Sequence, residues 1–196
     1  NTCADMNISL FDAYNYTVYV PTNEAIEKLH AEGYLPYWTD VENLTVDDFG
    51  GNNNKFKEAK TALAARIINF LKYHIQDNSV IIGGADNANV KFETFTNNPV
   101  NKRFYSIMVT SDKDKLEVTD QMGTHCSVVK TPGLYNIQGR EYWIKNKDKE
   151  NDVVYNASDV VVHQIDGALI YNQKEQLNSW GELIGLSTSK SKARRR

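Results

Sequence analysis

The side chains best suited to chemistry in this chain are its four histidines, its cysteines and the carboxylates near them. His30, His74, His125 and His163 are scattered along the sequence. His163 and Asp166 lie three residues apart near a predicted strand, so their side chains face opposite ways and do not form the His–Asp pair of a hydrolase triad. The sequence has no glycine-rich phosphate loop, no His-Glu-x-x-His and no Gly-x-Ser-x-Gly motif. We therefore predict no catalytic residue and no enzyme.

The two cysteines, Cys3 and Cys126, leave two interpretations open. The ligands of a zinc site cluster in the sequence, so this spacing predicts no metal site, and no cofactor is indicated. In an oxidising compartment the two could pair, and closing so long a loop would stabilise the fold by about 4–5 kcal/mol in the chain-entropy model. Alternatively both thiols are unpaired, and Cys126 is buried as a small apolar residue.

The composition limits the kinds of partner. The chain of 196 residues is 41% hydrophobic and 24% charged, as is typical of a folded globular protein. Its net charge of −3 opposes binding to nucleic acid, which needs a basic surface. The basic run Arg194-Arg195-Arg196 ends the chain and is expected to be solvated. No apolar stretch approaches the roughly 18 residues of a transmembrane helix, so none is predicted.

The first half of the chain predicts a strand and two helices. Residues 16–20 are aromatic and β-branched, which favours a strand. Pro21 ends that strand, and Thr22 or Asn23 can cap the helix that follows. A second helix is expected from about residue 55 to residue 75, where apolar residues recur at helical spacing.

In the second half of the chain, apolar residues recur at every second position instead of at helical spacing. Alternating residues between 92 and 128, separated by turns at 111–114 and 120–123, predict a β-meander. Residues 160–165 begin as an apolar run on both faces, which is typical of a central strand. Residues 131–152 open with Thr-Pro-Gly and end in a charged run, and we interpret them as an insertion.

Three segments occur together and in order. They are Thr-Val-Tyr-Val-Pro-Thr-Asn-Glu-Ala at residues 17–25, Phe-Leu-Lys-Tyr-His at 70–74, and Val-Val-Val-His-Gln-Ile-Asp-Gly-Ala-Leu at 160–169. The trio resembles the fasciclin (FAS1) domain family. That family has a Thr-Val-Phe-x-Pro-Thr-Asn/Asp-x-Ala segment, a Tyr-His pair at a helix end, and a Val-Ile-His-x-Ile-Asp-x-Val-Leu segment. The resemblance covers residues 16–171, with the predicted meander where the family has one.

The resemblance implies an α+β fold, namely a β-sandwich or wedge of FAS1 type flanked by several α-helices. The FAS1-like domain is expected at residues 16–171, with the insertion at 131–152. Residues 1–15 would be an N-terminal lead-in, which is shorter than the helical segment of the family because the chain is truncated there or because this member differs. Residues 172–196 would be a C-terminal tail that ends in the basic run. The insertion and the abundance of asparagine resemble bacterial surface members, such as those of Bacteroidetes, more than animal ones.

The residues that carry the resemblance predict structural roles. A proline followed by an N-cap makes a sharp corner between strand and helix, and a histidine at a helix end can bond the last carbonyls. A histidine within an apolar strand needs a buried hydrogen-bond partner. The fold-defining residues are Pro21, Thr22, Asn23, Ala25, Tyr73, His74, His163, Ile165 and Asp166.

FAS1 domains belong to secreted and surface-anchored proteins and are associated with cell adhesion and matrix binding. The resemblance therefore implies a non-enzymatic extracellular or cell-surface adhesion module, which is secreted, periplasmic or anchored at the outer surface. Its partner would be a surface protein or an extracellular matrix component. In animal members, integrin adhesion is ascribed to an Asp-Ile pair and to the Tyr-His region. Here Val154 and Tyr155 stand at the Asp-Ile positions, so integrin binding is not supported by that pair.

An alternative function is a carbohydrate-binding accessory protein at a bacterial outer surface, with a polysaccharide as partner. Sugar rings stack on flat aromatic faces, and several aromatic residues fall in predicted loops or in the insertion. Local packing of these rings in their loops is the competing interpretation. Taken with the Tyr-His pair, the candidate binding residues are Tyr37, Trp38, Tyr73, His74 and Trp143.

Overall fold

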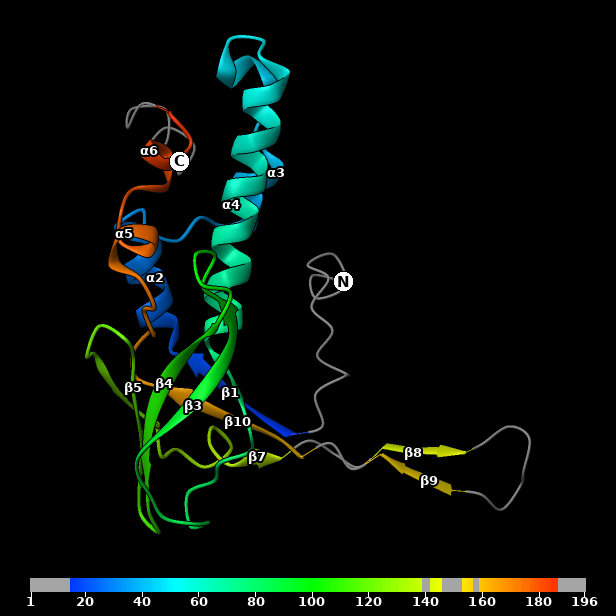
Figure 1. The fold of residues 1–196 in the computed structure, drawn as a ribbon, viewed down its shortest axis with the longest axis vertical. Helices are drawn as coiled ribbons and strands as arrows, with labels where there is room; N and C mark the ends of the chain where they lie inside the picture. The colour runs from blue at the N-terminus through cyan, green and yellow to red at the C-terminus, as the bar shows by residue number, and fades with distance from the viewer. Residues whose placement is uncertain (1–14, 139–141, 146–152, 157–158, 187–196) are drawn as a thin grey trace.

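The computed structural model describes residues 15–138, 142–145, 153–156 and 159–186, and it shows a mixed α+β fold (Figure 1). A curled eight-stranded sheet has the strand order β6-β5-β4-β3-β2-β1-β10-β7, and β8 pairs with β9 in a separate ribbon. The helices stack beyond one end of the sheet (Figure 1). The predicted α+β class is confirmed.

The strands that carry the first and third motif segments lie side by side in the sheet. β1 (Asn15–Pro21) runs parallel to β10 (Asp159–Ile165), and the short β2 (Ile75–Asp77) pairs antiparallel with β1 on its other side. β7 (Ile137–Gln138) pairs antiparallel with β10. The strands predicted at 16–20 and 160–165 are therefore confirmed, and both have neighbours on two sides.

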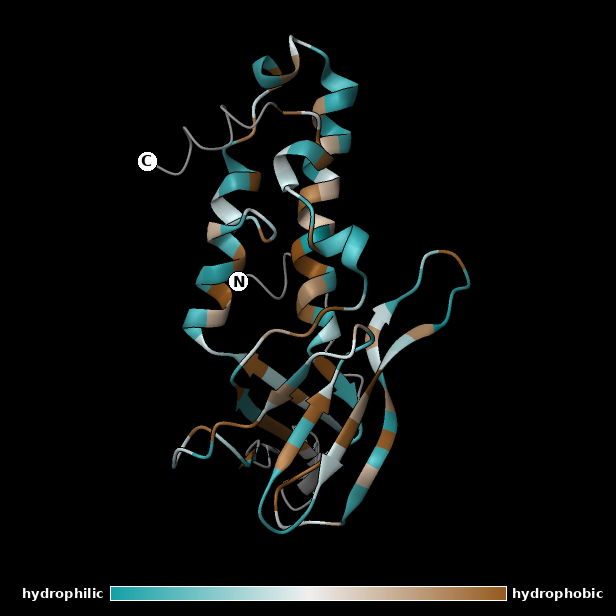
Figure 2. Cartoon of the chain, turned by 90° about the vertical axis from the view of Figure 1, so that its left-hand side faces the viewer, coloured by the Kyte–Doolittle hydropathy of each residue, from teal (hydrophilic) through white to brown (hydrophobic). Residues whose placement is uncertain are grey.

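The predicted meander is also confirmed. β3 (Asn87–Asn97), β4 (Phe104–Ser111), β5 (Leu116–Thr119) and β6 (His125–Ser127) pair antiparallel in sequence order. Hydrophobic and hydrophilic residues alternate along much of β3 and along β5 (Figure 2), as the period of two requires, whereas β4 carries three apolar residues in succession at 107–109. β3 is longer than its apolar residues alone predict, because its polar first half also pairs with β4, with a register shift between Asn87 and Val90.

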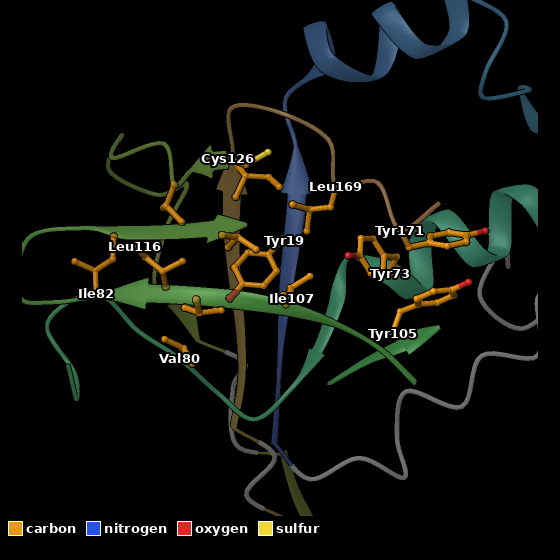
Figure 3. Packing of buried hydrophobic residues seen from close by; sticks show 14 residues of the cluster. Tyr19, Tyr73, Val80, Ile82, Tyr105, Ile107, Leu116, Cys126, Leu169 and Tyr171 are labelled. Atoms are coloured by element: carbon orange, nitrogen blue, oxygen red, sulfur yellow. The ribbon is translucent and has the colours of Figure 1, made fainter. Parts of the chain in front are cut away.

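The far end of the meander returns to the centre of the sheet. Val128 forms a bridge with Ile165, and the amide of Val129 donates to the carbonyl of Gln164 at 2.8 Å. The sheet is therefore curled around an interior, and the main core fills that interior (Figure 3). The buried core residues are Tyr19, Tyr73, Val80, Ile82, Tyr105, Ile107, Val109, Leu116, Val118, Cys126, Val128, Ile165, Leu169 and Tyr171.

The insertion predicted at 131–152 includes β7 and β8. β8 (Tyr142–Lys145) pairs antiparallel with β9 (Val153–Asn156). The side chains of these two strands lie outside the described part of the structure, as do residues 146–152.

The helices begin where the sequence provides caps. α2 (Asn23–Ala31) is capped by the Thr22 hydroxyl, which accepts a hydrogen bond from the Ala25 amide at 3.4 Å. α3 (Trp38–Glu42) and the 3-10 helix η2 (Val46–Phe49) precede α4 (Asn53–Tyr73), the long helix predicted at 55–75. None of the helices in the described ranges is both long and apolar enough to cross a membrane.

Residues 172–186, which the sequence assigns to a tail, pack on the helices instead. They form α5 (Gln173–Gln176) and α6 (Trp180–Leu183). Trp180 is 1% exposed and belongs to a second core cluster with Leu63 and Val41. Each of these helices is a single turn, so neither produces a helical period in the sequence. The packed part of the chain thus extends beyond residue 171.

We predict that Trp180→Ala destabilises the protein by about 3–5 kcal/mol, because it removes a large buried ring from α6. The matched control is Leu183→Ala on the same helix, where the side chain is 44% exposed, and it should cost less than about 1 kcal/mol. Urea unfolding of both variants measures the difference. Equal and small effects would show that residues 172–186 are not part of the folded unit.

Candidate functional site

The parallel strands β1 and β10 end at the same edge of the sheet, where the first and third motif segments continue. The Thr22 amide donates to the Ile165 carbonyl at 3.0 Å and ties the two strand ends together. Asp166 exchanges two hydrogen bonds with Ser127, because its amide donates to the Ser127 carbonyl at 3.0 Å and its Oδ1 accepts from the Ser127 amide at 2.8 Å. The corner predicted from the sequence is thus fixed by backbone and carboxylate contacts.

The other corner residues take the places that the motif predicts. Pro21 ends β1, and Asn23 is the exposed first residue of α2. Ala25 is half-buried, and Ile165 is fully buried in the core. These residues shape the edge of the sheet from which α2 departs.

Tyr73 and His74 are both buried at the end of α4. The His74 Nε2 accepts a hydrogen bond from the Leu169 amide at 2.9 Å, so Nδ1 carries the proton and donates to the Phe70 carbonyl at 2.8 Å. Burial lowers the pKa of His74 to about 4, which keeps the ring neutral at pH 7. The Tyr73 hydroxyl donates to the Ser106 carbonyl at 3.2 Å. As candidate binding residues neither side chain reaches the surface, and their geometry fits a structural role.

His163 holds two loops against the sheet. Its Nδ1 accepts from the Asn136 amide at 3.1 Å, so Nε2 carries the proton and donates to the Val80 carbonyl at 2.8 Å. The ring stacks on Tyr19 with centroids 6.1 Å apart. His163 is fully buried, whereas Asp166 is exposed and bonded to Ser127, so the structure does not bring them together as an acid–base pair.

The segment 169–172 leaves the sheet and crosses the core, and buried side chains accept its amides. His74 accepts the amide of Leu169, and the Asp120 carboxylate accepts that of Ile170 at 2.8 Å. The Oε1 of Gln176 accepts the next two amides at 2.6 and 3.1 Å. Sequence reasoning missed Asp120 and Gln176, because Asp120 is indistinguishable from an ordinary turn residue and Gln176 lies in a segment without a period.

A groove of about 490 Å³ lies between α2 and this anchored segment, at the meeting point of the first and third motif segments. Its apolar part includes the buried Leu29 and Ile170 and the half-buried Leu177. The charged residues of its lining are three carboxylates and one ammonium, and all four residues are exposed. They are Glu24, Glu32, Asp166 and Lys28. We take this groove as the candidate functional site.

The aromatic residues proposed for sugar binding do not form one platform. Tyr37 is 40% exposed, but one face of its ring stacks on His30 at 3.7 Å between centroids, and its hydroxyl donates to Glu27 at 3.1 Å. Trp38 packs against the cluster that contains Trp180. The side chain of Trp143 lies outside the described residues.

Cys126 is buried against the groove wall. Its Sγ lies 2.8 Å from the position that a Cβ on Gly167 would occupy, so any larger residue at position 167 would force the Cys126 side chain or the backbone to shift. Burial raises the pKa of the thiol to about 12, and a protonated thiol is a poor nucleophile. The burial expected for Cys126 is confirmed, whereas Cys3 lies outside the described residues.

Within the part of the chain that is described, no group of three histidine, cysteine or acidic side chains is placed to hold a metal ion. In comparisons with known proteins, no family model matches the chain and no curated protein is similar enough to match it.

We predict that acid weakens the fold through His74. Its pKa is about 4 when folded and about 6.5 when unfolded, so the unfolded chain binds the proton first as the pH falls. Stability from this residue is complete above pH 6.5 and should fall by about 3 kcal/mol toward pH 4. Urea unfolding between pH 8 and pH 4 measures this change. His74→Gln should flatten the slope, and an unchanged slope in that variant would contradict the assignment.

We also predict that Gly167→Ala destabilises the protein by about 1–3 kcal/mol, because the new methyl group meets the Cys126 sulfur. In a double-mutant cycle, Cys126→Ala should remove most of this penalty. Thermal unfolding of the four proteins in the cycle gives the coupling. Additive effects of the two substitutions would mean that the close contact is not the cause.

Proposed function

We propose that this chain is a non-enzymatic binding module of fasciclin type that acts outside the cytoplasm, whether secreted, periplasmic or anchored at the outer surface. The support is that three resembling segments, distant in sequence, are adjacent in space. Thr22 of the first bonds Ile165 of the third, and His74 of the second bonds Leu169 of the third. We further interpret the curled sheet as the wedge of that family, with the helices at its flank.

The observation that carries the proposed function is the groove between α2 and the anchored segment. Its apolar floor gives an occupant a place to bury a side chain, and its rim carries an excess of negative charge. The chemistry that fits both is a protein segment in which Lys or Arg adjoins an apolar residue. The proposed partner is therefore an exposed segment of this kind on a surface or matrix protein.

Binding of a polysaccharide is the second candidate, and it rests on the exposure of Tyr37. It has weaker support, because His30 covers one face of that ring and Trp38 packs inward. A glycan array separates the two candidates. A selective signal that disappears on denaturation and in Tyr37→Ala would favour the carbohydrate function.

We predict that short peptides selected from a random displayed library bind the folded chain and are enriched in Lys or Arg beside apolar residues. The double substitution Glu24→Lys with Glu32→Lys should lower the affinity for these peptides by about tenfold, because it reverses the net charge of the groove rim. Affinity is measured by calorimetry at low and physiological salt, since exposed charges are screened as salt increases.

The matched control for this experiment is Glu42→Lys with Glu93→Lys, which makes the same change in net charge at two exposed positions outside the groove. It should leave the affinity within about twofold. Equal losses in both double variants would mean that net charge alone attracts the peptides. Full affinity in the Glu24/Glu32 variant would remove the groove as the binding site.

A further inference from the structure

Arg66 is a buried cation on α4, with 6% of its surface exposed. The ion pairs among the described residues are Lys113–Asp114 and Lys115–Glu117, and Arg66 takes part in neither. Burial lowers the pKa of its guanidinium, and the exposed carboxylate of Glu175 opposes that shift without forming an ion pair with it, so the group stays protonated at neutral pH. A charge in such a place is costly unless an opposite charge lies beside it.

Neutral oxygen atoms hold the guanidinium in place. Its Nη1 donates to the carbonyls of Tyr34 at 3.2 Å and of Asn178 at 2.8 Å, and its Nη2 donates to the Asn178 side-chain oxygen. These bonds account for three of the five N–H groups of an arginine. They orient the group but bring no negative charge to it.

Gln176 places a second donor in the same region. Its Oε1 accepts from the amides of Tyr171 and Asn172, which fixes the orientation of the side-chain amide. The other end of that amide, Nε2, is buried and has no hydrogen-bond partner among the described residues. Only 5% of Gln176 is exposed, so bulk solvent does not supply the missing acceptor.

Arg66 and Gln176 line one small cavity, whose other walls include Leu29, Leu35 and Phe70. Its volume of about 10 Å³ is enough for roughly one particle the size of a water molecule. The unpaired group and the charged group in its lining are both hydrogen-bond donors. The occupant that suits the cavity is therefore small, accepts hydrogen bonds and carries negative charge.

We propose that this cavity is a binding site for one monovalent anion of the size of chloride, held by the Nε2 of Gln176 and the guanidinium of Arg66. A water molecule would satisfy the amide but would bring no negative charge into the cavity beside the guanidinium, and a phosphate or sulfate is too large for the volume. Because Gln176 also accepts the amides of Tyr171 and Asn172, the anion joins α4 and α5 to the segment that forms the groove floor.

The test is the thermal midpoint of the wild-type chain at constant ionic strength, with sodium chloride exchanged for sodium gluconate. For a site with a dissociation constant of about 10 mM, the midpoint should rise by roughly 4–8 °C as chloride increases to 300 mM, and above about 10 mM it should rise with the logarithm of the chloride concentration. Bromide should act like chloride, and sulfate should not. Equal midpoints in chloride and gluconate would overturn the proposal and leave the cavity to water.

Gln176→Glu supplies the negative charge from the chain itself while keeping an oxygen for the Tyr171 and Asn172 amides. This variant should lose the halide dependence. Gln173→Glu, the same change at an exposed position of α5, should keep it. Halide dependence that persists in Gln176→Glu would place the anion elsewhere. If that variant does not fold, crystals of the wild type grown in bromide decide, because the proposal requires an anomalous peak beside the Nε2 of Gln176.

Discussion

The structure depends on how the amides of residues 169–172 find acceptors after they leave the sheet. A buried amide without a partner costs about 1–3 kcal/mol, so four in succession cannot stand unpaired in a fold of ordinary stability. Among the described residues, no strand pairs with this segment. Its acceptors are instead the side chains of His74, Asp120 and Gln176, which come from α4, the β5–β6 turn and α5. One stretch of backbone therefore joins the sheet, the meander and the C-terminal helices.

This constraint explains both the groove and the cavity beneath it. The segment that receives these hydrogen bonds carries Ile170, which lines both hollows, and Leu29 and Tyr34 of the opposite wall do the same. Because its amides are fixed, the groove floor is rigid, and a rigid site loses less entropy when a partner binds. Gln176 serves both features, since its oxygen accepts the amides of the floor and its side chain lines the cavity together with Arg66.

The sequence pattern was enough to predict the elements whose conformation depends on neighbouring residues in the chain. The apolar runs gave the central strands, the period of two gave the meander, and Thr22 gave the start of α2. The packing of residues 172–186 could not be predicted, because one-turn helices have no period and Trp180 finds its place only through tertiary contacts. Gln176 was missed for the same reason, since its partners are set by three-dimensional proximity.

The motif residues are buried, whereas the charged residues of the groove rim are exposed. This difference explains why the sequence indicates a fold more readily than a ligand. The side chains of Tyr73, His74 and His163 form their hydrogen bonds with other groups of the protein. A change of ligand would therefore not require these residues to change. The groove rim has the opposite property. Glu24 and Lys28 are exposed on the outer turns of α2, where substitution costs little stability. If the proposed function holds, specificity resides in these few surface positions, and the same scaffold can present a different rim to a different partner.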